Sequence, residues 1–216
     1  MTRKLTLVLT ISDMKSSRSY TMRVRAESTA NTRERILNAV IGLSEERLSV
    51  EIVLADVAAR AGVSVQTVLR HFGGKDMLFE QAQARHLEQV RAERATPVGD
   101  VAAAVRTIVT FYDRTGDWSV RLQAVEHRDE RSRDTVADGR RLHRAWVEEV
   151  FAPQLAACAA CATRADREEL VDLLVIATDV LTWKILRRDA GLDHESTCGR
   201  MLRLVKAVVS QLPEEG

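Results

Sequence analysis

The sequence predicts an all-α fold, and three observations support that prediction. Ala, Leu, Val, Glu and Arg dominate the 216 residues, and these residues favour helix over strand. Only 3 residues are proline and 4% are aromatic. Apolar residues recur three and four positions apart in successive segments, which is the period of an amphipathic helix. We expect about nine helices.

Length and charge limit the possible functions. The chain is long enough for one or two domains with a sizeable core. Its net charge is +1 with 29% charged residues, so any affinity for DNA must come from a local patch. No run of about 18 apolar residues occurs, which argues against a membrane-spanning helix. The 3 cysteines do not suggest a disulfide scaffold, and they fit a reducing cytoplasm.

The segment from Val53 to Asp76 has the pattern of two short helices joined by a tight turn. The first helix has one apolar face, formed by Leu54, Val57, Ala58 and Ala61. Gly62 follows where a residue with positive φ is favoured, and Ser64 can cap the next helix. The second helix would bury Val68 and Phe72. This arrangement predicts a helix-turn-helix over residues 53–72, whose second helix can lie in a DNA major groove.

Four short motifs in this region resemble TetR-type transcriptional regulators. They are DVAARAGVS at residues 56–64, TVLRHF at 67–72, KDML at 75–78 and, upstream, TRERIL at 32–37. The resemblance covers roughly residues 31–92. Taken alone, the stretch around Gly62 could be a helical corner with a solvated polar face in an unrelated protein. With the flanking motifs in register, the family resemblance is the stronger interpretation.

The resemblance implies a division into domains. Residues 31–78 would form the N-terminal three-helix DNA-binding domain, with its helix-turn-helix. Residues 79–216 would form a larger C-terminal helical domain for effector binding and dimerisation.

The resemblance also implies roles for single residues. Arg33, His71 and Lys75 are expected to hold phosphates. The recognition helix would present a second set of side chains to the bases: Val65, Gln66, Thr67, Leu69 and Arg70. Two positions depart from the family pattern. Val53 stands where Thr or Ser is usual, so it lacks the hydroxyl that would cap the helix and contact a phosphate, and Leu69 stands where Tyr is common.

Residues 1–30 are expected to form a basic and disordered N-terminal extension. A short apolar run from Leu5 to Ile11 follows two basic residues, but the sequence after it has no cleavage site, so we do not expect export. Two interpretations remain open. Either the extension is a basic arm that contacts phosphates, or translation begins at Met22.

Turn residues and apolar periodicity give approximate bounds for the other helices. The first predicted helix spans Thr32 to about Glu46, and the fourth begins at Lys75 and stops near Thr96 and Pro97. The following helices are expected at Val101 to about Gly116, Trp118–Glu126, Arg131–Leu155 with a bend at Pro153, Arg164–Asp189 and Asp193–Leu212.

The last two predicted helices are apolar on nearly all sides, which indicates burial against a partner chain. Family resemblance also places a homodimer interface there. The predicted interface residues are Leu173, Ala177, Val180, Leu181, Leu202, Val205 and Val209.

Aromatic and histidine side chains of the C-terminal domain are candidates for an effector pocket, although core packing, or a surface position for a histidine, is the simpler interpretation of each one. The set is Tyr112, Trp118, His127, His143, Trp146 and Trp183. Cys158 and Cys161 form a C-x-x-C motif that could act as a redox pair or contribute to a metal site. On a helix they would also share one face and pack as small apolar residues, which we favour.

The leading hypothesis is a cytoplasmic, ligand-responsive regulator, most simply a repressor. It would bind double-stranded DNA at a near-palindromic operator as a homodimer and be released by an unknown small-molecule effector. No catalytic or metal-binding motif occurs, so we predict no enzyme activity, no metal, no cofactor and no membrane partner. The alternatives are a thiol-based redox sensor or small redox enzyme using Cys158 and Cys161, and a helical adaptor protein.

Overall fold

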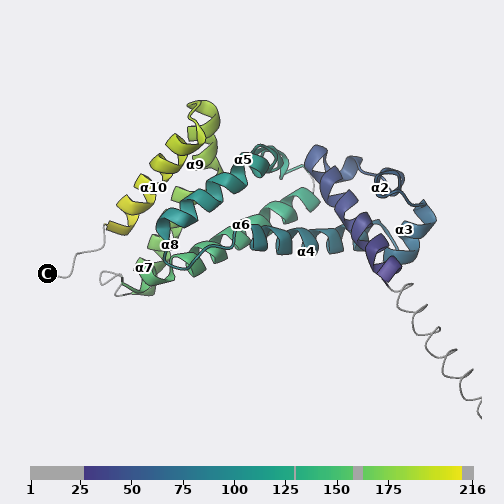
Figure 1. Cartoon of the computed structure of the whole chain (residues 1–216), viewed down its shortest axis with the longest axis horizontal. Helices are drawn as coiled ribbons and strands as arrows, with labels where there is room; N and C mark the ends of the chain where they lie inside the picture. Colours follow the sequence, from purple (N-terminus) through teal and green to yellow (C-terminus); the bar gives the residue numbers. More distant parts are fainter. Residues whose placement is uncertain (1–26, 129, 158–162, 211–216) are drawn as a thin grey trace, which may run out of the picture. The chain divides into compact units, whose positions relative to one another are not determined.

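The computed structural model describes residues 27–128, 130–157 and 163–210. Within these ranges the chain is helical and contains no strand, which confirms the predicted class (Figure 1). The chain divides into two compact units. Unit 1 comprises the described residues up to Ser44 together with Ile52–Ala82, and unit 2 comprises Glu45–Glu51 and the described residues from Gln83 onward. No helix in the described ranges is both long and apolar enough to cross a membrane.

Unit 1 is built from a helix over residues 27–46 as far as Ser44, α2 (Leu54–Ala61), α3 (Val65–Phe72) and the first part of α4 (Lys75–Glu93). Its core gathers the apolar faces predicted from periodicity, including the fully buried Ile36, Val57 and Leu78. The first helix extends further than expected. Residues 27–30, assigned from sequence to a disordered extension, are helical, and the hydroxyl of Thr32 donates to the carbonyl of Ser28 at 2.9 Å. The rest of the expected extension, residues 1–26 with Met22, lies outside the described residues.

Unit 2 is a bundle of longer helices. Its elements are η1 (Ser49–Glu51), the rest of α4, α5 (Val101–Val125), α6 (Glu130–Val150), α7 (Ala152–Ala156), α8 (Arg164–Thr178), α9 (Val180–Lys184), a π-helical turn (Ile185–Asp189) and α10 (His194–Ser210). The central helix α5 packs against α6, α9 and α10, and α10 runs beside it (Figure 1). Trp183, Ile108 and Met201 are fully buried between these helices.

The expected helix end at Gly116 is wrong, because α5 continues through it to Val125. The predicted short helix Trp118–Glu126 is therefore the last part of α5. Gly116 is buried and faces Trp183, whose ring atom Cζ3 would lie 2.4 Å from a Cβ at position 116. This glycine permits close packing between helices and does not mark a terminus.

Two other predicted helices are divided. The helix expected over Arg131–Leu155 ends at Val150, and Pro153 belongs to the first turn of the separate helix α7. The helix expected over Arg164–Asp189 is interrupted at Asp179, which has extended backbone angles. The Asp179 carboxylate accepts a hydrogen bond from the backbone N–H of Leu181 at 2.8 Å and so caps α9. The predicted cap of the last helix is present, since Asp193 accepts from the N–H of Ser196 at 2.7 Å.

Candidate DNA-binding surface and effector cavity

The turn between α2 and α3 has the geometry that the sequence predicts. Gly62 has φ 64° and ψ 42°, the left-handed conformation that side chains disfavour. The N–H of Val63 donates to the carbonyl of Ala58 at 2.9 Å, which closes the end of α2. Ser64 then caps α3 by accepting from the N–H of Thr67 at 3.1 Å. The orientation in which α3 leaves the turn is therefore fixed locally.

Arg35 on the first helix also fixes this turn, and the sequence analysis did not find it. Its Nε donates to the carbonyl of Ala61 at 3.1 Å, and its Nη2 donates to the carbonyl of Gly62 at 3.1 Å. Both carbonyls lie at the C-terminal end of α2, where a cation is favourable. No local sequence signal distinguishes Arg35 from a surface arginine.

The start of α2 is capped without the missing hydroxyl of residue 53. Val53 is extended and 53% exposed, and its side chain caps nothing. The carboxylate of Asp56 instead accepts from the N–H of Val53 at 3.3 Å. The helix terminus is thus stabilised from its third position, whereas no hydroxyl is available at residue 53 for a phosphate.

Helix α3 has one buried and one exposed face. Val68 and Phe72 are 1% and 5% exposed and pack into the core of unit 1. The expected base-contacting residues lie away from that core: Val65, Gln66, Leu69 and Arg70 are exposed, and Thr67 is half-buried. The Thr67 hydroxyl lies 3.0 Å from that of Ser64, so it is engaged at the helix start.

The three residues expected to hold phosphates are all half-buried, and two rest on aromatic rings of unit 1. The guanidinium of Arg33 lies 5.0 Å from the centroid of Phe72 and donates a hydrogen bond to Gln81. The ammonium of Lys75 lies 5.4 Å from the ring centroid of Phe79. His71 is tilted against Phe72 at 6.3 Å. Unit 1 therefore holds His71 on α3, and Arg33 and Lys75 beside it, against aromatic rings of its core.

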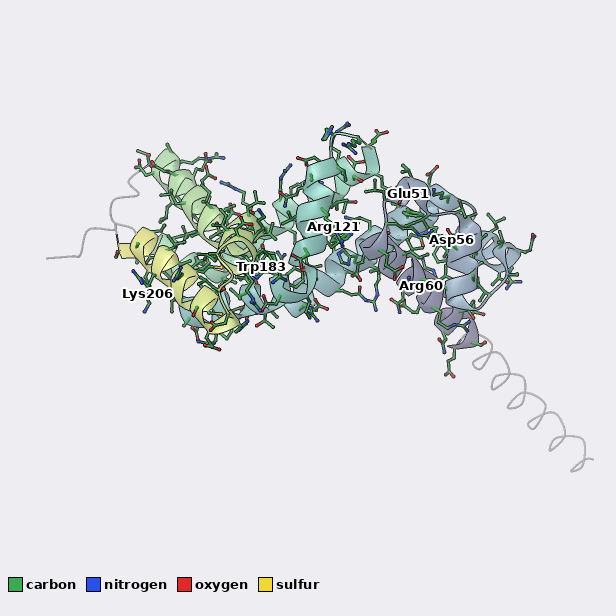
Figure 2. The ribbon with its side chains drawn as sticks, turned by 90° about the horizontal axis from the view of Figure 1, so that it is seen from above. Glu51, Asp56, Arg60, Arg121, Trp183 and Lys206 are labelled. Atoms are coloured by element: carbon green, nitrogen blue, oxygen red, sulfur yellow. The ribbon has the colours of Figure 1, made fainter. Side chains whose placement is uncertain are left out.

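Unit 2 contains a cavity of about 260 Å³ between α4, α5 and α6, with Asp179 and Val180 on a further side. Three of the six residues expected to form a pocket line it: Tyr112, Trp118 and His143. The other three do not. Trp183 lies inside the helical bundle, as Figure 2 shows, and is 0% exposed. Trp146 is buried and stacks on His143 at 5.7 Å, and His127 is exposed.

Arg94, just beyond α4, lines the cavity and was missed from sequence. It is only 8% exposed, and its guanidinium carbon lies 4.1 Å from the ring centroid of Phe111. The indole Nε1 of Trp146 donates to the Arg94 carbonyl at 2.9 Å and anchors the backbone there. Burial lowers the pKa of Arg94, although the arginine stays charged. Because arginines are usually exposed, no local pattern could place this one inside.

Two other titratable groups in the cavity are held neutral. Burial, aided by the charge of Arg94, lowers the pKa of His143 to about 3. Burial also raises the pKa of the Tyr112 phenol far above its ordinary value. Near neutral pH the cavity wall therefore combines one buried cation with two neutral polar groups.

The predicted interface residues divide between surface and core. Leu173 and Leu181 are 37% and 47% exposed. Leu202 and Val209 are half-buried and pack against the core of unit 2. Ala177, Val180 and Val205 are 5%, 4% and 0% exposed, so placing these three on an exposed seam is wrong. All three belong to the core of unit 2, so the apolar stripe that was expected to face a partner chain packs within the unit.

The C-x-x-C motif, Cys158 and Cys161, lies outside the described residues. Cys198 is described and buried, with its sulfur 3.6 Å from Nε2 of His194. Burial raises its pKa, which keeps the thiol protonated and unreactive.

Comparisons with known proteins agree with this architecture. Residues 53–82 match the family model of bacterial regulatory proteins of the tetR family. A crystal structure of a TetR-family regulator from Rhodococcus sp. has 22% identity and a TM-score of 0.59, with 82% of this chain and 98% of that chain covered. A second, from Streptomyces coelicolor, has 18% identity and a TM-score of 0.57, with 86% and 91% covered. No curated protein matches the chain in sequence.

The structural likeness supports the fold, and the family match falls on α2, α3 and the start of α4. This is also where the left-handed Gly62, the Ser64 cap and the two-faced α3 form a helix-turn-helix. Residues 53–82 therefore match the helix-turn-helix region of tetR-family regulatory proteins, and the chain shares its fold with solved TetR-family regulators.

Proposed function

We propose that this protein represses transcription by binding a near-palindromic operator as a homodimer, and that a small molecule in unit 2 releases it. The observation that best supports specific DNA reading is the exposed face of α3, where Gln66 and Arg70 lie opposite the buried Val68 and Phe72. Arginine favours guanine and glutamine favours adenine in the major groove. Two adjacent turns of α3 therefore offer different base preferences.

Phosphate contacts would set the position of α3 in the groove. Arg33, His71 and Lys75 are the proposed contacts, and the aromatic rings beneath Arg33 and Lys75 limit the freedom of both cations. Because Val53 supplies no hydroxyl, these three side chains would carry more of the phosphate binding than in relatives with Thr or Ser there.

The proposed homodimer would use the exposed apolar face of the broken helix region α8–α9. Leu173 and Ile176 are three residues apart on α8, and both are exposed. Leu181 and Ile185 are four apart after the break, and are 47% and 57% exposed. Such a patch on a monomer indicates an interaction site, and a two-fold axis would bury both copies of it. The same axis would relate the two copies of α3, with a separation of about 34 Å between them, which is one turn of DNA.

The cavity of unit 2 is the proposed effector site. The effector would bind more tightly to a conformation that cannot fit the operator than to the one that can. It would lower operator affinity by at most the ratio of those two effector affinities. Repression would then be relieved when the effector accumulates in the cytoplasm, where this regulator would meet its operator.

Selection from a pool of randomised duplexes tests the DNA-binding proposal directly. We expect enrichment of a two-fold symmetric sequence whose half-sites lie about one helical turn apart, with two chains bound per duplex. The double variant Gln66→Ala, Arg70→Ala should fold and enrich nothing. An enriched sequence without two-fold symmetry, or one chain per duplex, would contradict the homodimer.

A further inference from the structure

We propose that the cavity of unit 2 binds a small, largely apolar monocarboxylate that carries a hydrogen-bond donor at its other end. Arg94 would hold the carboxylate, and Nδ1 of His143 would accept the donor. This inference rests on the proposed function, in which the cavity receives an effector, and names the chemical class of that effector.

Arg94 is a buried cation whose hydrogen bonds are incomplete. The phenol of Tyr112 accepts one hydrogen bond from the guanidinium, but Nε and Nη1 are buried without a hydrogen-bond partner. No described carboxylate forms an ion pair with Arg94; Asp179 and Glu93 act on it only through longer-range attraction. A buried charge without a counter-charge is costly, and each unpartnered guanidinium N–H can donate to a carboxylate oxygen. A bound carboxylate would supply the missing partner.

His143 presents a buried acceptor in the same cavity. The Thr178 hydroxyl donates to the carbonyl of Leu174 at 2.7 Å, so its oxygen is left to accept from Nε2 of His143 at 3.2 Å. Nε2 therefore carries the single proton of the neutral ring, and Nδ1 has only a lone pair. Nδ1 is buried and has no partner. A ligand hydroxyl or N–H would satisfy it.

The other charged groups of the wall are already engaged or lie at its exposed edge. Arg114 pairs with Glu93 at 2.6 Å, Arg140 with Glu126 at 2.9 Å, and Asp117 with Arg188 at 2.9 Å. Asp179 caps α9, and Arg121 is exposed. Burial lowers the pKa of His86, which favours its neutral form, and Glu45 is exposed on the first helix. Arg94 is thus the buried cation of this wall that lacks a counter-charge, and it can pair with one negative charge on a ligand.

The rest of the cavity sets the size and polarity of the ligand. Its apolar wall includes Leu87, Val90, Phe111, Leu122, Val136 and Leu142. The volume of about 260 Å³ lies just below the usual range of about 300–1,000 Å³ for ligand pockets, so the ligand is small. A cationic ligand would add to the buried positive charge, and a neutral one would leave the guanidinium without a counter-charge. An aryl ring between a carboxylate and a hydroxyl combines these features in one small molecule.

Calorimetric titration of the full chain without DNA tests this inference. The probes are para-hydroxyphenylacetate, its amide, and phenylacetate, which lacks the hydroxyl. We expect the hydroxy acid to bind about tenfold or more tightly than its amide. Arg94→Met keeps an unbranched side chain over Phe111 and should abolish that preference. Arg114→Met removes an exposed cation from the cavity edge and should leave the preference intact.

The His143→Phe variant tests the second contact, because phenylalanine preserves a ring against Trp146. It should lose the preference for the hydroxy acid over phenylacetate and keep the preference for acid over amide. The proposal is overturned if no acid binds, if acid and amide bind alike, or if Arg94→Met, shown to be folded by circular dichroism, keeps the preference. Operator release is measured separately. Acid binding that leaves the DNA complex intact would refute the effector role and keep the ligand assignment.

Discussion

The indole of Trp183 occupies the space that a side chain on Gly116 would need, since a Cβ there would lie 2.4 Å from its Cζ3 atom. The ring is 0% exposed, and its Nε1 donates to the carboxylate of Asp113 at 3.0 Å. Arg187 and His194 reach the same carboxylate at 3.0 and 2.9 Å. Residues from α9, the π-helical turn and α10 thus converge on the middle of α5, which places them against one side of unit 2.

Gly116→Ala should destabilise unit 2 because the Trp183 ring cannot move away without breaking its packing. Overpacking of this kind costs about 1–3 kcal/mol, which exceeds the gain of up to about 1 kcal/mol from alanine in a helix. Gly199 on α10 is the matched control, because a Cβ there meets nothing within 4 Å. Chemical denaturation should show a loss for the first variant and a small gain for Gly199→Ala. If the two variants change stability equally, the Trp183 ring can move to accommodate a methyl group at position 116.

Arg70→Ala should weaken binding to the selected operator by about 1–3 kcal/mol and relax the preference at one base position in each half-site. The physical reason is the exposed position of Arg70 on α3, where its guanidinium can meet guanine. Competition binding with single-base operator variants measures this. An unchanged specificity profile would assign Arg70 to a phosphate.

Lys75→Met should lower affinity for all DNA sequences to a similar extent. Methionine keeps an unbranched side chain near Phe79 and removes the charge, so stability should change little. The slope of log affinity against log salt should decrease by about one for each phosphate that the variant no longer neutralises. Titrations at several salt concentrations give the slope for operator and random DNA. A change confined to the operator would indicate base contact.

The buried His143 should make unit 2 sensitive to acid. Its pKa is about 3 when folded and 6.5 when unfolded, so only the unfolded chain takes up the proton between those values. Above about pH 7 His143 is neutral in both states and does not reduce stability. Between about pH 7 and about pH 5 its protonation in the unfolded chain lowers the free energy of unfolding by about 2 kcal/mol. His143→Phe should remove that part of the loss. The free energy of unfolding of both proteins is measured from denaturation curves at the two pH values. If both lose the same stability at the lower pH, another group causes the acid sensitivity.

The helix-turn-helix could be predicted because its signals are local. Gly62 and Ser64 specify the turn through their own conformation and hydrogen bonding, independently of distant residues. Gly116 was misinterpreted for the opposite reason: its role depends on Trp183, 67 residues later, and helix propensity alone suggests a terminus there.

The cavity could be predicted only in part. Tyr112, Trp118 and His143 were identified because aromatic and histidine side chains often line pockets, although the same reasoning selected Trp146 and Trp183, which lie in the core. Arg94 is placed inside by the packing of α4 against α5 and α6, which no local pattern specifies. Asp179 did leave a sequence signal, since a helix-capping residue stands inside an otherwise apolar run.

The proposed dimer can be tested only at residues that the structure places on the surface. Glutamate at the buried Val180 or Val205 should unfold unit 2, because a charge without a partner would enter its core. Leu173 and Leu181 are exposed, so Leu173→Glu with Leu181→Glu can be tolerated by a monomer. In the proposed dimer, the same pair would place like charges across the two-fold axis.

We therefore expect Leu173→Glu with Leu181→Glu to give a folded monomer that loses most of its operator affinity, because one recognition helix alone lacks the gain from linking two. The control is Val98→Glu, which charges a residue that is 55% exposed between α4 and α5. It should remain dimeric and bind the operator normally. Sedimentation and operator titration on the same samples decide the outcome. A dimer that survives both glutamates would place the interface on another surface, such as the exposed Leu204 on α10.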